Sequence, residues 1–405
     1  MRWSVKVLAA AAALCVGTSL AQAQYSDGII KLGVMNDQSG LYSDLSGQGS
    51  VWSAKKAIED FCKTTKCHDK IEVVFADHQN KPDVGSNIVR QWFDVDKVDA
   101  VVDVPTSSVA LAVNNITKEK NKVFLVSGAA SSDLTGKACT PNTVHWTYDT
   151  WALANGTGNA IVKTGGDTWF FLTADYAFGH ALERDTAAVV EKSGGKVVGK
   201  VRHPFPGQDF SSFLLQAQQS KAKIIGLANA GSDTTNAIKQ AAEFGIVQGG
   251  QNLAGLLVFI TDVHALGLKT AQGLVLTEAW YWDQTDNNRA FAKEFGAANK
   301  GNMPTMVQAG VYSAVFHYLK AVHDLKSDAD GAAVVAKMKA LPTDDKLFGK
   351  GSIRVDGRKI HPMYLFEVKS PAESKGPWDY YKVRATIPAD EAFRPLAEGG
   401  CPLVK

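Results

Sequence analysis

The chain has 405 residues, 43 lysines and arginines, 41 aspartates and glutamates, and a formal net charge of +2. This balance gives no indication of a nucleic acid or an anionic membrane surface, and we expect neither as a partner. About 380 residues would remain after removal of an export signal, which is too many for one ordinary core and suits two α/β domains.

The first 23 residues have the pattern of an export signal. Arg2 and Lys6 precede an apolar stretch from Val7 to Leu20, and Ala21-Gln22-Ala23 has the small-x-small form that signal peptidase cuts after. We therefore expect cleavage near Ala23. No later apolar run reaches about 18 residues, so we expect no direct membrane insertion.

Four cysteines follow the signal, an even number for an oxidising compartment, which predicts two disulfides. Three pairings are possible. We favour Cys62 with Cys67, as a local link after the first helix, and Cys139 with Cys401, which would fix the C-terminal tail.

Strand-like and helix-like segments alternate along the first part of the chain. Such alternation predicts a parallel sheet with helices on both faces. The expected strands are Ile29–Val34, Lys70–Asp77, Ala100–Val104 and Val123–Val126. One expected helix begins at Gly49, and two more cover Pro82–Val98 and Ser107–Lys120.

A second series of the same kind predicts a second lobe. Its expected strands are Thr168–Leu172, Lys196–Val201, Lys223–Ala228, Leu256–Phe259 and Gly273–Thr277. Its expected helices are Phe178–Ser193, Phe210–Ser220, Asp233–Phe244 and Val263–Leu268. Two long helices, Asn287–Lys300 and Thr305–Leu325, and two short strands, Ser352–Val355 and Met363–Val368, complete the chain. No Pro-, Gly- or Ser-rich linker separates the halves, which favours a chain that crosses between the lobes several times.

Small and hydroxylic residues follow several predicted strands. In an open α/β sheet, ligands bind beyond the carboxyl ends of the strands, where helix starts offer N–H groups to a carboxylate. In the first lobe these ends contain Asn36 to Gly40, Pro105 to Ser108, and Ser127 to Ser132 with Ala129, Ala130 and Ser131. Helix capping is the alternative role for each of them.

Aromatic and acidic residues join the hydroxyls at the strand ends of the second lobe. An acid there can hold an ammonium group, and rings can form the wall of a pocket. The candidates are Tyr176, Phe178, Asn229, Asp233, Asp262 and Trp280. Capping for Asp233, and core or lobe-interface packing for Trp280, are the alternatives.

Motifs for catalysis are missing from the sequence. It has no Gly-x-Ser-x-Gly, HExxH, P-loop or Cys-x-x-Cys motif. Gly47-Gln48-Gly49 lies about a dozen residues after its strand, too far for a dinucleotide turn. We expect no metal, no cofactor and no enzymatic activity.

Taken together, the segments IKLGVMNDQSGLYSDLSGQG, ADHQNKPD, VPTSS, FLVSGAASSDLTG and ADYAFG resemble the type I periplasmic solute-binding proteins of ABC importers. The most similar branch is the leucine/isoleucine/valine-binding, or hydrophobic amino acid, family, and the resemblance covers essentially all of the mature chain. It implies a periplasmic monomer with two doubly wound lobes joined by three crossovers, which closes on a ligand and meets a permease in the inner membrane. We expect one lobe from residues 24–147 and 278–354, and the other from 148–277 and 355–405.

The resemblance also assigns ligand contacts. Its carboxylate-binding segments match Thr106, Ser107, Ala129 and Ser131, its second-lobe aromatic matches Phe178 with Tyr176 nearby, and its amine-binding acid falls near Asp262. A family aromatic falls on Leu45, although Tyr42 is close, and a family tyrosine falls in the segment Asn229-Ala230-Gly231. Loss of both rings predicts a larger pocket.

Three functions follow as hypotheses. The first is a receptor for a small carboxylate-bearing solute of the hydrophobic amino acid type, with an aromatic or other amine-free carboxylic acid as the alternative ligand. The second is an exported α/β enzyme, which would need a histidine beside Ser107 or Ser131. The third is a ligand-sensing subunit of the same fold.

Overall fold

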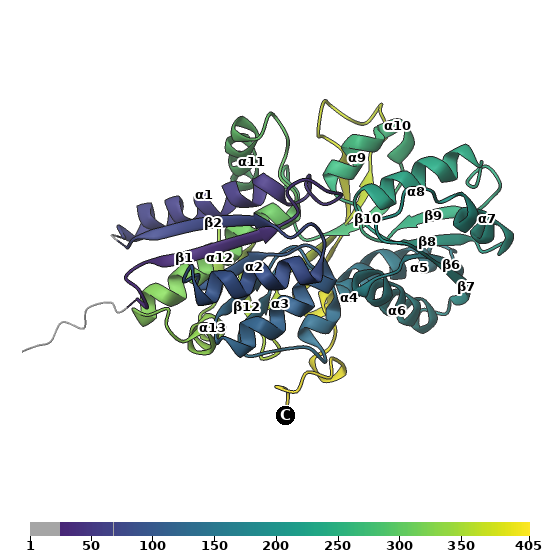
Figure 1. Cartoon of the computed structure of the whole chain (residues 1–405). Helices are drawn as coiled ribbons and strands as arrows, with labels where there is room; N and C mark the ends of the chain where they lie inside the picture. Colours follow the sequence, from purple (N-terminus) through teal and green to yellow (C-terminus); the bar gives the residue numbers. More distant parts are fainter. Residues whose placement is uncertain (1–24, 68) are drawn as a thin grey trace, which may run out of the picture.

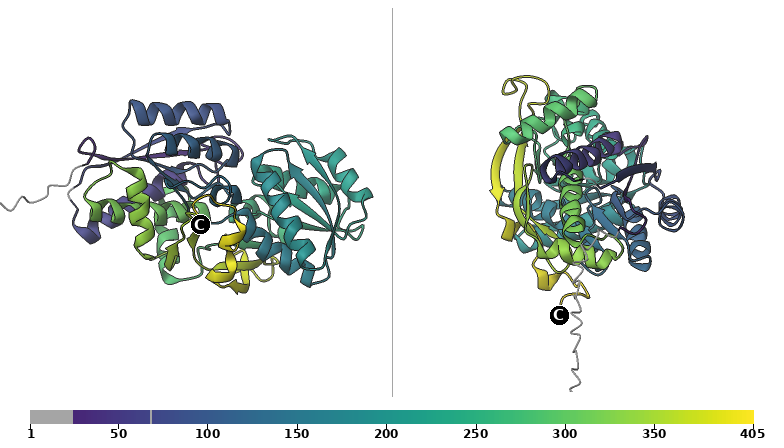
Figure 2. Two further views of the ribbon diagram at one scale, coloured as in Figure 1. Left: turned by 90° about the horizontal axis from the view of Figure 1, so that it is seen from below. Right: turned by 90° about the vertical axis from the view of Figure 1, so that its left-hand side faces the viewer.

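The computed structural model describes residues 25–67 and 69–405, so the expected signal, residues 1–23, lies outside the described residues. The chain forms two α/β lobes that lie side by side, with the C-terminal strands running between them (Figure 1). Figure 2 shows the same division from below, with the second lobe as a separate body of helices around a sheet.

The first sheet has five parallel strands in the order β2-β1-β3-β4-β5. Its strands are β1 Ile30–Asn36, β2 Ile71–Asp77, β3 Ala100–Asp103, β4 Val123–Val126 and β5 Thr143–His145. Its first helices are α1 Gly47–Thr65, α2 Pro82–Asp94 and α3 Ser107–Glu119. β3 and β4 are buried throughout, which explains their unbroken apolar sequences.

The second sheet has four parallel strands in the order β7-β6-β8-β9. They are β6 Thr168–Ala174, β7 Lys196–His203, β8 Ile224–Ala228 and β9 Asn252–Gly255. The helices around them are α6 Ala177–Lys192, α7 Ser211–Gln219, α8 Ser232–Glu243, α9 Ile260–Leu266 and α10 Leu268–Ala271. The two doubly wound lobes expected from the sequence are confirmed.

Two strand predictions in the second lobe are wrong. β9 ends at Gly255, and the apolar residues 256–259 follow it as a connection into α9. The segment predicted as a last parallel strand is β10, Val275–Glu278, which lies in a separate antiparallel sheet, β10-β14-β15. Its partners are β14 Met363–Val368 and β15 Tyr381–Ile387. An apolar run indicates that a segment is buried, but it does not show which element buries it. Both segments are buried without belonging to the parallel sheet.

The segment after β10 packs against the first lobe, where its longest helix, α12 (Met306–Leu325), runs along α1. Its elements are α11 Asp286–Ala298, α12 Met306–Leu325, α13 Gly331–Ala340, β11 Thr343–Asp345, β12 Gly349–Ile353 and β13 Lys359–Ile360. Trp52 of α1 meets Phe291 and Phe295 of α11 edge-on. The sequence did not predict the helical segment made of α4 Thr150–Leu153, a π-turn and α5 Asn159–Lys163. It also did not predict α13, β5, β11, β13, β15 and the short helix α14 Ala389–Ala392. The exact lobe boundaries stay a prediction.

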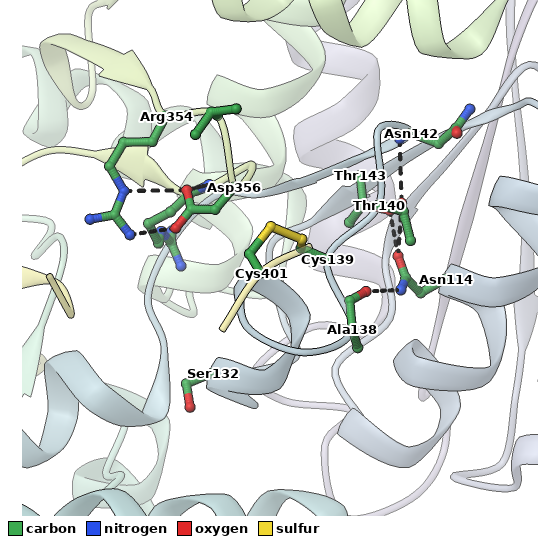
Figure 3. The surroundings of a disulfide bond; sticks show 12 residues. Asn114, Ser132, Ala138, Cys139, Thr140, Asn142, Thr143, Arg354, Asp356 and Cys401 are labelled. Atoms are coloured by element: carbon green, nitrogen blue, oxygen red, sulfur yellow. Dashed lines mark hydrogen bonds and ion pairs between the residues drawn. A yellow bond between two sulfur atoms is a disulfide. The ribbon is translucent and has the colours of Figure 1, made fainter. Parts of the chain in front are cut away.

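Both predicted disulfides are confirmed. Cys62 pairs with Cys67, and Cys139 pairs with Cys401. Figure 3 shows the bond between Cys139 and Cys401 beside the turn that carries Thr140, whose hydroxyl donates to Asn114 of α3. This bond holds the end of the chain against the loop that follows β4.

Candidate ligand-binding site

A narrow cavity lies between the two lobes, at the carboxyl ends of their parallel strands. The residues that line it come from both sheets and from the first crossover, and none carries a charge. They are Tyr42, Leu45, Pro105, Gly128, Ala130, Tyr148, Tyr176, Phe178, Ala230, Leu257 and Phe259.

Asp37 shapes the loop that presents Tyr42 and Leu45. Its side chain is fully buried and accepts hydrogen bonds from the backbone N–H groups of Ser39, Gly40 and Tyr42. The amide of Asn80 donates to the same carboxylate over 2.7 Å. The long polar loop after β1 is therefore an ordered wall of the cavity.

Asn80 joins this loop to the start of α3. Its side-chain oxygen accepts a hydrogen bond from the hydroxyl of Thr106, the residue that precedes the helix. Thr106 does not cap α3 with its side chain. Asp103 and Val104, just before it, have positive φ angles of 83° and 55°, an unfavourable conformation for a branched side chain such as valine. The backbone is thus bent to bring Pro105 to the cavity.

The segment after β4 forms the next part of the wall. Tyr148 donates its hydroxyl proton to the carbonyl of Gly128 over 2.7 Å, which fixes the phenol ring against the cavity. A side chain at Gly128 would lie 2.7 Å from the carboxylate of Asp103 and 2.8 Å from the backbone of Pro105. Only glycine fits this close approach. Burial raises the pKa of Asp103 to about 6, although Asn36 and Ser127 donate hydrogen bonds to its carboxylate.

The second lobe closes the cavity mainly with rings. Tyr176 and Phe178 come from the turn between β6 and α6, and Leu257 and Phe259 from the connection after β9. The Phe259 ring meets the Tyr148 ring edge-on across the cavity, at 6.2 Å. Phe205, on the loop after β7, stacks on Tyr176 with ring centroids 3.9 Å apart.

The lobes touch directly in two further places. The hydroxyls of Tyr42 and Tyr176 share a hydrogen bond. Gly231, with φ of 59°, lies so close to the carbonyl of Leu41 that a Cβ would be 2.6 Å from it. These contacts describe a closed arrangement of the two lobes.

Three helices begin at the cavity without a side-chain cap and without an acid in the first turn. They are α1 after Ser46, α3 after Thr106 and α6 after Tyr176. Because free N–H groups and the helix dipole favour negative charge, these helix starts form a receptor for an anionic group. α9 differs, since Asp262 accepts the N–H of Phe259 at its start over 2.8 Å.

The candidate acids lie behind the wall. Burial raises the pKa of Asp233 to about 7 and that of Asp262 to about 7, and it raises that of Glu278 well above its usual value. Asp233 accepts the N–H of Gly207 over 3.0 Å with one oxygen, and its other oxygen, Oδ2, has no partner among the described residues. Glu278 accepts a hydrogen bond from Tyr381.

The structure brings five predicted site residues to the cavity surface, namely Tyr42, Leu45, Ala130, Tyr176 and Phe178. Other predicted residues support the wall instead. The hydroxyl of Ser107 accepts a hydrogen bond from the backbone N–H of Ser131. The hydroxyl of Ser131 accepts one from the backbone N–H of Asp133. Ala129, Asn229, Asp233 and Asp262 are buried and do not line the cavity. Trp280 lines a different cavity, with Asn288 and Phe348, because β10 lies outside the parallel sheet.

Sequence reasoning missed six lining residues, Pro105, Gly128, Tyr148, Ala230, Leu257 and Phe259. Four of them lie within three residues of a predicted candidate, and Leu257 lies five residues from Asp262, so most of the lining follows the predicted strand ends. Tyr148 had no signal of its own. The larger pocket expected from the loss of two family rings stays a prediction.

No helix in the described part of the chain is long and apolar enough to cross a membrane. Across residues 25–67 and 69–405, no group of three or more histidines, cysteines or acids is placed to hold a metal ion.

The fold and the cavity are those of a two-lobed solute-binding protein. A family model described as periplasmic binding protein matches residues 29–377. The chain therefore belongs to the periplasmic binding protein family, a family of solute receptors.

Solved structures agree over nearly the whole chain. A periplasmic binding protein from Burkholderia mallei is 53% identical, with a TM-score of 0.90, over 94% of this chain and all of that one. A branched chain amino acid ABC transporter periplasmic ligand-binding protein from Burkholderia xenovorans LB400 is 40% identical, with a TM-score of 0.81, over 93% of this chain and all of that one. The Leu/Ile/Val-binding protein homolog 6 of Brucella melitensis biotype 1 is 26% identical over 88% of this chain and 91% of its own length.

Proposed function

We propose that this protein captures a small carboxylate-bearing solute between its lobes in the periplasm and delivers it to the permease of an ABC importer. The observation that carries the proposal is the uncharged, ring-lined cavity at the junction of the two sheets, next to three uncapped helix starts. The helix starts would hold the carboxylate, and the rings would hold the apolar part of the solute.

Closure of the lobes is the physical basis of capture. A solute that contacts Pro105 and Ala130 on one side and Phe178 on the other interacts better with the closed state than with an open one. It therefore shifts the population toward closure, by no more than the difference in its affinity for the two states. Delivery to the permease then requires reopening of the lobes.

The cavity favours an acid without an amino group. An ammonium ion needs a carboxylate or several acceptors, and no lining side chain is charged. Asp262 already binds the N–H of Phe259, and three uncapped helix starts would repel a cation.

A hydrophobic amino acid is the second candidate. The free oxygen of Asp233 lies in the second lobe, and the charge of this acid acts on the hydroxyls of both Tyr42 and Tyr176. A shift of this side chain toward the cavity would give an ammonium group a partner.

A thermal-shift panel tests the proposed function. Leucine, valine and phenylalanine are compared with 4-methylpentanoate, 3-phenylpropanoate and benzoates, each with the product mixture analysed for turnover. A true ligand at a hundredfold its Kd adds about 2.7 kcal/mol of stability. We expect a shift from amine-free acids and no turnover. If no carboxylate of either kind shifts the melting temperature, or if a hit is consumed, the receptor function is refuted.

A further inference from the structure

The chain passes between the lobes three times: between β5 and β6, between β10 and α11, and between β13 and β14. After β15 the segment 388–401, which we call the C-terminal tail, runs to the disulfide between Cys401 and Cys139. It is drawn in yellow beside the end of the chain in Figure 1. The two ends of this tail belong to different lobes.

The start of the tail belongs to the second lobe. Phe366 of β14 and Tyr381 of β15 lie in one hydrophobic cluster with Leu172 of β6, so the strand that precedes the tail is packed on the second-lobe core. Further on, the carbonyl of Glu391 accepts a hydrogen bond from the side-chain amide of Asn155 over 2.9 Å. Asn155 lies in the π-turn that packs against α6 of the same lobe.

The end of the tail belongs to the first lobe. Cys139 lies in the loop after β4, and Asn114 of α3 holds this loop by donating to the carbonyl of Ala138 over 2.8 Å (Figure 3). Gly136 lies so close to the tail that a Cβ there would be 2.7 Å from the carbonyl oxygen of Gly399. Both cysteines are buried, so the disulfide is part of a packed contact.

The middle of the tail lies over the segments that cross between the lobes. The guanidinium of Arg394 donates to the carbonyl of Ser132 over 3.0 Å. The ring of Phe393 is buried, and its centroid is 4.5 Å from the guanidinium carbon of Arg358, which precedes β14. That guanidinium also donates to the carbonyl of Tyr148, between β5 and α4. The tail therefore contacts two of the three crossings.

Two attachments of the tail to opposite lobes are close together in the chain. Glu391 is bound by Asn155 on the side of the second lobe, and Arg394 is bound to Ser132 on the side of the first. The backbone between Glu391 and Arg394 spans at most about 11 Å when fully extended. The tail thus has little slack, and the disulfide prevents it from detaching from the first lobe.

Separation of the lobes would pull on this part of the tail. Ser132 begins the short helix η1 Ser132–Thr135, and its hydroxyl donates to the carboxylate of Asp185 on α6 over 2.6 Å. Next to it, Arg184 of α6 pairs with Asp133 of η1 at 3.1 Å. Because η1 and α6 belong to different lobes, opening lengthens these contacts and moves η1 away from the start of the tail.

We propose that the C-terminal tail is a fourth link between the lobes, made permanent by the disulfide between Cys139 and Cys401, and that it limits how far the protein opens. The inference goes beyond the proposed function, because it concerns the unliganded protein and requires no particular solute. By limiting the open state, the tail keeps the lobes near the arrangement in which one solute contacts both of them.

Small-angle X-ray scattering of the unliganded protein tests this inference. Cys139→Ser/Cys401→Ser should have a larger radius of gyration than the wild type, because its lobes are free to open further. The curves are fitted with the closed structure and with the two lobes rotated apart, which distinguishes an opening from a loosened tail. Cys62→Ser/Cys67→Ser is the matched control, since it removes a disulfide within the first lobe and should keep the wild-type radius.

A second variant keeps the test independent of the folding of the disulfide variant. Arg394→Gln retains both disulfides and loses the donor to Ser132. It should increase the radius of gyration in the same direction by a smaller amount. Circular dichroism and the melting temperature show which variants fold, and Arg394→Gln decides the test if Cys139→Ser/Cys401→Ser does not.

Two results would overturn the inference. One is a wild-type radius of gyration in every folded variant of the tail. The other is an equal increase in Cys62→Ser/Cys67→Ser, which would mean that the loss of any disulfide loosens the fold. Both results leave the receptor function to the thermal-shift panel, and a panel without any bound carboxylate would refute that function without changing the scattering test.

Discussion

Hydroxyl side chains around the cavity hold the wall, while their apolar neighbours face the solute space. Thr106 bonds to Asn80 and Ser107 bonds to the backbone of Ser131, so Pro105 and Ala130 are left at the surface of the cavity. The polar groups that remain for a solute are the backbone N–H groups at the helix starts and the hydroxyls of Tyr42 and Tyr176. Specificity then depends on shape and on very few hydrogen bonds.

This arrangement also explains how far the sequence could predict the site. The predicted strand ends border the cavity, because parallel strands place their carboxyl ends at one edge of a sheet. The sequence could not show which of two adjacent residues turns inward, as Thr106 and Pro105 illustrate. That choice depends on Asn80, which is 26 positions away from Thr106 in the chain and has a positive φ angle of 59°.

Asp233 gives a prediction for pH dependence. Its pKa is raised by burial to about 7 in the folded protein, against 3.8 for the ordinary group. Because the folded protein holds the proton of Asp233 more tightly than the unfolded chain does, the stabilisation is complete below the pKa of the unfolded chain. It is lost as the pH rises from there through the pKa of the folded protein, about 7. Asp233→Asn removes the effect and keeps an acceptor for Gly207. The free energy of unfolding of the variant relative to wild type should therefore rise by about 2 to 4 kcal/mol between pH 4 and pH 8.

The measurement is urea unfolding at several pH values. Other buried acids and histidines titrate equally in both proteins, so the difference isolates Asp233. Parallel pH profiles for wild type and Asp233→Asn would contradict the assigned burial.

At the scale of elements, the sequence predicted the parallel strands and their helices well and the crossovers poorly. β3 and β4 are unbroken apolar runs, and such runs are characteristic of strands buried on both faces. Leu257 and Phe259 belong to a similar run, yet they are buried by the opposite lobe and not by neighbouring strands. β15 alternates too weakly to be seen, since most of its residues are exposed.

The disulfides differ in how much of the chain they enclose. Cys139 and Cys401 are 262 positions apart, and Cys62 and Cys67 are 5 apart. By the loop-entropy model, the bond between Cys139 and Cys401 contributes about 5 kcal/mol to the free energy of unfolding. The bond between Cys62 and Cys67 contributes about 2 kcal/mol. The double variant Cys139→Ser/Cys401→Ser should therefore melt at a clearly lower temperature than Cys62→Ser/Cys67→Ser, as measured by calorimetry. Equal losses would show that the long link does not restrict the unfolded chain.

At the scale of the whole molecule, closure depends on a glycine. Gly231 lies on the loop after β8, and Leu41 lies on the loop after β1. A Cβ added to Gly231 would be 2.6 Å from the carbonyl oxygen of Leu41. Gly231→Ala should hold the lobes apart and weaken solute binding at least about tenfold, or about 1.4 kcal/mol. Calorimetric titration with the best acid of the panel measures this loss.

The variant Gly267→Ala is the control that distinguishes a clash between the lobes from local backbone strain as the cause of weaker binding. Gly267 also has a positive φ, 75°, but a Cβ there would meet nothing within 4 Å. This variant should share the local strain and keep the affinity. The same loss in both variants would mean that strain, and not contact between the lobes, limits binding.

The structure of the protein crystallised with its tightest-binding acid tests the account most directly. We expect one molecule enclosed between the lobes, with its carboxylate at the starts of α1, α3 or α6 and its apolar part among Tyr148, Phe178 and Phe259. A solute bound outside this cavity, or inside it with the carboxylate away from these helix starts, would contradict the proposed function.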